Sequence, residues 1–129
     1  MKKQVLLPKP GTVNNAPYSE IVKYGNLLFV SGQLSEDLET GEAIHADIAT
    51  QTTNAMNNIK AKLEEVGSSM DEIIKVTIYL SKAELFADMN AAYKKFFSEG
   101  EMPARICTYG AQIYDGLDVE IECIAGIEE

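Results

Sequence analysis

The sequence is poor in the residues that build metal and redox centres. Its 129 residues include two cysteines, one histidine and no tryptophan. Cys107 and Cys123 form no C-x-x-C motif, and together with His45 they are too few for a structural zinc site with four Cys or His ligands. Both cysteines fall within apolar strand patterns, which favours reduced, buried thiols over a disulfide. We therefore expect no metal site and assign no role to His45.

Positive charge and long hydrophobic runs are scarce as well. Eleven basic residues face twenty acidic ones, so the net charge is −9, and the basic residues form no run. Such a surface repels phosphate backbones, so nucleic acid is not an expected partner. No segment approaches the roughly 18–20 apolar residues of a membrane span, and the N-terminus lacks the features of a signal peptide. We expect one cytoplasmic domain over residues 1–129, without membrane association.

Hydrophobic periodicity predicts six strands and two helices. Gly25-Asn26 joins two strand patterns as a hairpin turn. Asp47 is placed to cap the first helix, which Gly67 ends, and Gly100 with Pro103 stops the second. The expected elements are strands at 4–7, 20–24 and 27–34, a helix at 48–66, a strand at 71–80, a helix from 84, and strands at 105–109 and 118–123.

The order β-β-β-α-β-α-β-β indicates an α+β fold, a mixed sheet with both helices packed on one face. In the strand over 71–80, period-two alternation puts Ile74 on the same face as Val76, Ile78 and Leu80. The other sheet face would then be semi-polar, which favours oligomerisation through it. We expect that face to carry Lys75, Thr77, Tyr79, Arg105, Cys107 and Glu120.

The stretch from Met102 to Cys123 places charges inside apolar strands. Arg105 shares a strand face with Cys107, and Glu120 lies opposite the apolar face of the last strand. If the two strands lie near each other, the arginine and the carboxylate can face one pocket. On the residues alone, this pair is either a salt bridge or a site for a small carboxylate.

Five segments carry a resemblance to a known family. They are Pro17-Tyr18, 29–33 (FVSGQ), 86–93 (FADMNAAY), 103–107 (PARIC) and 119–122 (VEIE). With them the chain resembles the RidA/YjgF family of 2-iminobutanoate/2-iminopropanoate deaminases, also called endoribonuclease L-PSP. The Pro-Ala-Arg strand followed by the glutamate of Val-Glu-Ile-Glu is the family's signature.

The resemblance implies a chorismate-mutase-like fold assembled as a homotrimer, with clefts between subunits. Small 2-imino or 2-enamino acids would be hydrolysed there to 2-ketoacids and ammonia, without a cofactor. Arg105 would anchor the substrate carboxylate, and Glu120 would position or activate the water. The cleft would be completed by Tyr18, Gly32 through its backbone N–H, Asn90 and Cys107, some of them from the neighbouring subunit.

This chemistry suits the residue types. Arginine binds a carboxylate through two parallel charge-assisted hydrogen bonds. An imine is already electrophilic, so catalysis needs orientation, a proton source and a placed water, and one carboxylate supplies the last two. We expect no covalent step, because Cys107 has no histidine beside it in the sequence.

The chain departs from the family pattern at Tyr109–Gly116, where members usually carry a Val-x-x-Leu-Pro-like segment. We expect this segment to influence the choice of substrate. Two other functions stay open. An endoribonuclease is disfavoured by the single histidine and the net charge of −9. A non-catalytic binder of small carboxylates would use the same Arg105 cleft, although Glu120 favours hydrolysis.

Overall fold

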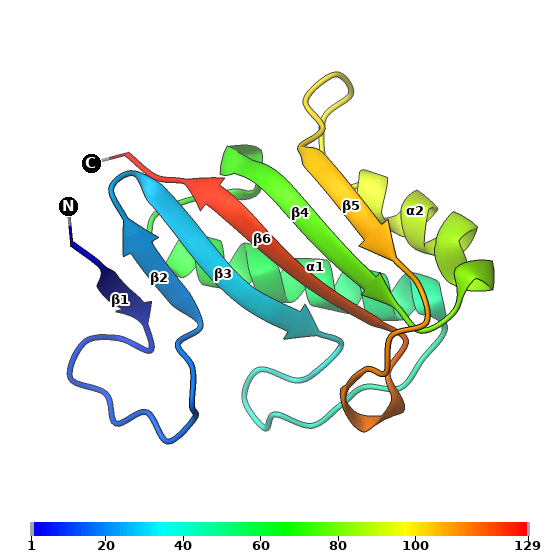
Figure 1. Cartoon of the computed structure of the whole chain (residues 1–129), viewed down its shortest axis with the longest axis horizontal. Helices are drawn as coiled ribbons and strands as arrows, with labels where there is room; N and C mark the ends of the chain where they lie inside the picture. Colours follow the sequence, from blue (N-terminus) through cyan, green and yellow to red (C-terminus); the bar gives the residue numbers. More distant parts are fainter. Residues whose placement is uncertain (1, 129) are drawn as a thin grey trace.

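The chain forms one six-stranded mixed sheet with two helices on one side (Figure 1). This computed structural model describes residues 2–128, so the two end residues of the expected 1–129 domain lie outside it. The predicted fold class and element order are confirmed. The elements are β1 (Gln4–Leu7), β2 (Ile21–Tyr24), β3 (Leu27–Leu34), α1 (Ile48–Glu65), β4 (Ile73–Leu80), α2 (Phe86–Lys94), β5 (Ala104–Thr108) and β6 (Val119–Gly126).

The sheet has the strand order β1-β2-β3-β6-β4-β5. All neighbours are antiparallel except β4 and β5, which run parallel. Figure 1 shows α1 running behind the sheet and α2 beside β5, the strand at one edge. Asp47 begins α1 as expected, because its side chain accepts a hydrogen bond from the Thr50 N–H at 2.7 Å.

The hydrophobic core lies between the sheet and the two helices. Along β6, Val119, Ile121 and Cys123 alternate inward, whereas Glu120 and Glu122 project to the other side. We call this other side, away from α1 and α2, the open face. No helix within residues 2–128 has the length and apolar character needed to cross a membrane.

The first half of β4 differs from simple alternation. Its register with β6 shifts between Ile73 and Lys75, so Ile73 enters the core and Ile74 is 50% exposed. The expectation that Ile74 lies in the core with Val76 is therefore wrong. A β-bulge is the physical reason, because one extra residue reverses the inward and outward positions on one side of it.

The position of Arg105 and Cys107 also differs from the expectation. In the parallel pairing of β5 with β4, Arg105 lies beside Val76 and Cys107 beside Ile78. Both β4 residues point into the core, so Arg105 and Cys107 point to the helix side and not to the open face. The parallel register decides this orientation. Because β5 is an edge strand, the arginine head can still reach solvent from that side.

The second helix, α2, is shorter at both ends than the sequence predicts. A 3₁₀ turn at Ala83–Leu85 precedes α2, which ends at Lys94, well before Gly100. Another 3₁₀ turn, Met70–Glu72, occupies the predicted start of the strand over 71–80.

Candidate functional site

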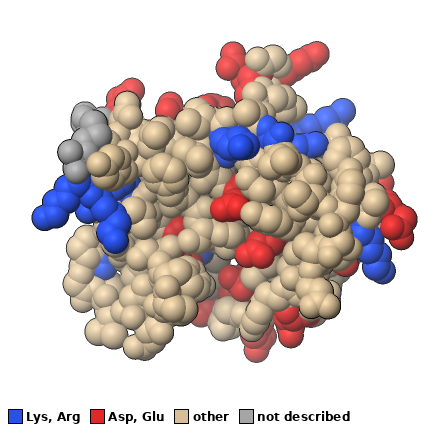
Figure 2. Space-filling view, viewed as in Figure 1, with Lys and Arg blue, Asp and Glu red and all other residues tan. Residues whose placement is uncertain are grey.

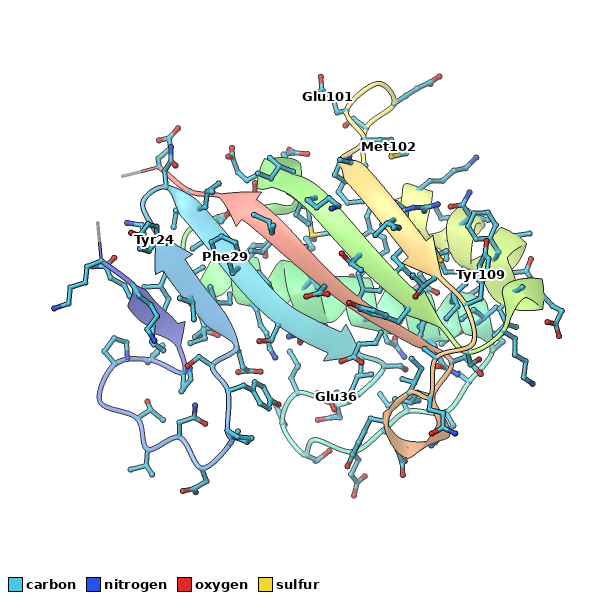
Figure 3. All side chains as sticks on the ribbon, viewed as in Figure 1. Tyr24, Phe29, Glu36, Glu101, Met102 and Tyr109 are labelled. Carbon is cyan, nitrogen blue, oxygen red and sulfur yellow. The ribbon has the colours of Figure 1, made fainter. Side chains whose placement is uncertain are left out.

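A cavity of about 640 Å³ opens where β3 ends and β6 begins. Among the residues expected in the site, its lining includes Tyr18, Gly32 and Glu120. Figure 2, which views the open face, shows acidic side chains gathered around a hollow in the middle and lower part of the molecule. Figure 3 places Glu36, another lining residue, just beyond the end of β3. The structure thus brings three of the six expected site residues together.

Glu120 lies directly against the backbone of Gly32. The register of β3 with β6 shifts between Val30 and Gln33, so β3 carries a bulge that contains Ser31 and Gly32. A Cβ added to Gly32 would meet the Glu120 carboxylate oxygen Oε2 at 2.3 Å. Only glycine therefore allows the carboxylate to lie this close to the strand.

The surroundings of Glu120 favour its protonated form. Burial raises the pKa of its carboxyl group above the ordinary value of 4.5, and the carboxylates of Glu122 and Glu36 raise that pKa further. Tyr79 on β4 donates a hydrogen bond of 2.6 Å to Glu122 Oε1, so Glu122 has a structural partner. A carboxyl group with a raised pKa in a cavity can act as a proton donor or acceptor.

Arg105 lies elsewhere, between β5 and α2. Its guanidinium carbon is 4.8 Å from the ring centroid of Tyr93 and 5.7 Å from that of Phe86, both on α2. These are cation–π distances. No carboxylate of residues 2–128 lies within salt-bridge distance of Arg105. A salt bridge with Glu120 or Glu122 inside one chain is therefore excluded, and the guanidinium is free to bind a carboxylate from outside.

Cys107 and Asn90 belong to the same edge as Arg105. Cys107 follows Arg105 by two positions on β5, is half-buried, and is a free thiol. Burial raises the pKa of this thiol, although the Arg105 charge opposes the shift, so the thiolate needed by a nucleophile is disfavoured. Asn90 lies four residues after Phe86 and three before Tyr93, which places it on the α2 face that meets Arg105.

The expected site residues therefore form two groups on opposite faces of the sheet. Tyr18, Gly32 and Glu120 line the cavity, and Arg105, Cys107 and Asn90 lie along the β5–α2 edge. Between β6 and β5 lies β4, and Glu120 points to the open face whereas Arg105 points to the helix side. Within one chain the two charges cannot contact the same small molecule.

The cavity also contains residues that the sequence patterns did not single out. They are Glu20, Glu36 and Lys62. Lys62 on α1 is only 7% exposed and pairs with Glu20. A signal was present, because Lys62 follows Ile59 by three positions and Ala55 by seven, which continues the buried stripe.

The segment Tyr109–Gly116 contributes one of its tyrosines to the cavity. Tyr114 lines the cavity and is 64% exposed. Tyr109 packs instead edge-on against Phe86, with ring centroids 6.0 Å apart, and Figure 3 shows it at the end of β5 beside α2.

His45 contacts Asp115 of this segment, with Nε2 and Oδ2 3.1 Å apart, although both side chains are exposed. Residues 2–128 hold no group of three His, Cys, Asp or Glu side chains arranged for a metal ion.

Comparison with known proteins finds a matching family model and similar proteins that cover most of the chain. The family model of endoribonuclease L-PSP matches residues 11–127. A RutC family protein of Pyrococcus abyssi is 40% identical over 125 residues, which cover 97% of this chain and 98% of the relative. The 2-iminobutanoate/2-iminopropanoate deaminase of Escherichia coli is 37% identical over 111 residues, which cover 84% of this chain and 86% of that enzyme.

Solved structures agree with the sequence relatives. The YjgF gene product of Escherichia coli superposes with a TM-score of 0.80 at 34% identity, covering 89% of this chain and 91% of that one. A Rid family protein of unknown function from Yersinia pestis gives 0.87 at 32% identity, covering 98% and 100%. Because the family match spans nearly the whole chain and the shared fold follows it, this chain belongs to the endoribonuclease L-PSP family, the RidA/YjgF proteins that its sequence motifs resemble.

Proposed function

We propose that this protein hydrolyses reactive 2-imino or 2-enamino acids to 2-ketoacids and ammonia. The observation that carries the proposal is the Glu120 carboxyl, which burial and neighbouring carboxylates bias toward protonation and which lies against Gly32 at a cavity. An acid of this kind can protonate an imine nitrogen or hold a water beside it. The deaminase from Escherichia coli, at 37% identity, supports the same reaction class.

Arg105 supplies the second half of the proposed site. Its guanidinium lacks a carboxylate partner in residues 2–128, and two aromatic rings of α2 lie at cation–π distance from it. A fixed guanidinium binds a substrate carboxylate through two parallel hydrogen bonds and so orients the adjacent C=N bond. Cys107 and Asn90 would line the same edge, with Cys107 as a protonated thiol and not as a nucleophile.

The two halves require two subunits. Arg105 and Glu120 point to opposite faces of one sheet, so a cleft that contains both takes them from different chains. The open face favours such an assembly because it carries exposed apolar side chains, including Phe29 at 43% and Ile106 at 53% exposure. We therefore propose a homotrimer in which the β5 edge of one subunit meets the cavity of the next.

In the proposed reaction, Arg105 of one subunit holds the substrate carboxylate while the imine lies beside Glu120 of the next. Glu120 donates its proton to the imine nitrogen, and a water adds its oxygen to the imine carbon and returns a proton to the carboxylate. The C–N bond of this adduct then breaks as the hydroxyl oxygen becomes the ketone oxygen and its proton leaves with the nitrogen as ammonia. The overall reaction consumes one water, and Tyr18 with the Gly32 backbone N–H would position the reacting groups.

A coupled assay tests the proposed activity. A threonine dehydratase generates 2-iminobutanoate in solution, and release of the 2-ketoacid is followed with and without the purified protein. We expect the protein to accelerate ketoacid release severalfold over the spontaneous hydrolysis. If rates with and without it were equal while the protein is folded and oligomeric, the enzyme interpretation would be wrong, and a binder of small carboxylates would be the better account.

A further inference from the structure

Lys62 is buried, which is unusual for a lysine. It extends from α1 toward the end of β3 and is 7% exposed. Its ammonium donates hydrogen bonds to Glu20 Oε1 and, at 2.8 Å, to Gln33 Oε1. Lysines are almost never this buried unless paired. The Glu20 side chain is 39% exposed, so solvent weakens the attraction within this pair, and stability alone does not account for Lys62.

The contacts of Lys62 lead to the bulge that carries Gly32. Gln33 accepts the Lys62 hydrogen bond, and its own Nε2 donates to the Ser31 carbonyl oxygen at 3.0 Å. Ser31 and Gly32 are the bulge residues, and Gly32 faces the Glu120 carboxylate. A hydrogen-bonded chain therefore runs from α1 through Gln33 to the backbone against which the proposed acid lies.

Lys62 also lies among carboxylates that line the same cavity. These are Glu20, which precedes β2, Glu36, which follows β3, and Glu120 on β6. Burial raises the pKa of Glu36, the Lys62 ammonium opposes that shift, and the Glu20 carboxylate adds to it more weakly. Glu36 in turn raises the pKa of Glu120. Asp37 and Glu65 line an adjoining hollow together with Lys62, Glu20 and Glu36. The further titratable groups facing this region are Tyr18 and Tyr114 in the cavity lining, and Glu122 and Tyr79 beyond Glu120 on the open face.

We propose that Lys62 is a positioning residue for the deamination: through Gln33 it holds the β3 bulge against Glu120, and it places a positive charge among the cavity carboxylates. The inference rests on the proposed function and adds a residue outside the sequence signature that indicated the family. In this account Lys62 touches neither the substrate nor the reacting water. It fixes the geometry and the charge of the groups that do.

Three variants separate positioning from simple structural support. Lys62→Met removes the ammonium and keeps the length of the side chain, but leaves Glu20 without its partner. The double variant Glu20→Gln/Lys62→Met removes both charges, so we expect it to unfold near the wild-type temperature. Lys60→Met is the matched control, because Lys60 is an exposed residue of the same helix.

The measurements are the unfolding temperature, kcat and KM for in situ 2-iminobutanoate across pH, and NMR titration of the Glu36 carboxyl carbon. In both variants that lack Lys62 we expect kcat to fall about tenfold with little change in KM, since a misplaced catalytic group slows the reaction step. The Glu36 carboxyl should titrate at higher pH in both, because the effect of Lys62 on its pKa exceeds that of Glu20. Lys60→Met should match the wild type throughout.

A double variant with wild-type kcat and an unchanged pH profile would overturn the proposal and leave Lys62 a structural residue. The same holds if the Glu36 titration does not move. An inactive wild-type protein would instead overturn the proposed function, and the role of Lys62 in it. The two failures are therefore distinguishable from the wild-type rate alone.

Discussion

Three features of its surroundings raise the pKa of the Glu120 carboxyl group. Partial burial, Glu122 beside it on β6 and Glu36 across the cavity all raise its pKa. Glu122 is held by Tyr79, whereas Glu36 lines the cavity and is accessible to substitution without loss of a described side-chain hydrogen bond. At the scale of single residues, Glu36 is thus the group through which the acidity of Glu120 can be changed most cleanly.

We expect Glu36→Gln to lower the pKa of Glu120. The ionised Glu36 disfavours a second negative charge nearby, so its neutral replacement lets Glu120 lose its proton at lower pH. The pKa should still lie above 4.5, because burial and Glu122 remain. In the pH profile of kcat/KM, the inflection that belongs to Glu120 should therefore shift to lower pH, and NMR titration of its carboxyl carbon should shift equally.

Glu42→Gln provides the control for this substitution, because Glu42 is an exposed residue of the same connection between β3 and α1. Its pH profile should match that of the wild type. An unmoved inflection in Glu36→Gln, or an equal shift in both variants, would refute the link between Glu36 and Glu120.

At the scale of secondary-structure elements, the bulge in β3 brings the Gly32 backbone against the Glu120 carboxylate. Gly32→Ala tests it directly. The added Cβ would lie 2.3 Å from Glu120 Oε2 and 2.9 Å from its Cδ, so the carboxylate must move. Because these atoms form the end of a flexible side chain, we expect the protein to fold with near wild-type stability and to lose about a hundredfold in kcat.

Gly126→Ala is the matched control, since its nearest contact is also a glutamate oxygen, Glu72 Oε2 at 3.1 Å, at the far end of β6. Circular dichroism, thermal unfolding and the ketoacid assay should show both variants folded and only Gly32→Ala impaired. Equal activity of the two would show that the Gly32–Glu120 contact has no role in the reaction.

Elements were predictable from the sequence where local periodicity decides them. The hairpin at Gly25-Asn26, the first helix with its Asp47 cap and the alternation of β6 all follow from such patterns. The side of the sheet to which a residue points was not predictable where pairing with a distant strand decides it. The bulge beside Ile73 depends on pairing with β6, and the direction of Arg105 depends on the parallel register of β5 with β4.

For the candidate site, the roles given to individual residues stay predictions, and their arrangement in space was not predictable from the sequence. The family motifs placed roles on Arg105 and Glu120, yet strand alternation alone put both on one face, and the structure separates them. Lys62 could have been noticed, because it falls on the buried stripe of α1. Its partners Glu20 and Gln33 could not, since the chain brings them to α1 only through the β2–β3 pairing.

At the scale of the whole molecule, the separation of Arg105 from Glu120 is the main consequence of the fold. The sheet has helices on one side and exposed apolar residues on the other, with Arg105 at the β5 edge and Glu120 at the cavity, and the proposed function treats these two places as half-sites. Figure 3 shows Tyr24 and Phe29 over β2 and β3 on the open face. Association through this face would join complementary half-sites of neighbouring subunits and repeat the site around a closed ring.

The most direct test of the proposed shared site is activity in the proposed trimers when they mix two variants, each of which is expected to be inactive alone. Arg105→Ala and Glu120→Gln subunits carrying different affinity tags are co-expressed, and trimers that hold both tags are purified. In a closed ring of three, any mixture of the two types contains one junction where an intact Arg105 meets an intact Glu120. We therefore expect each pure variant to be inactive and the mixed trimers to regain about a third of the wild-type ketoacid release. Mixed trimers as inactive as the pure variants would contradict a site shared between subunits.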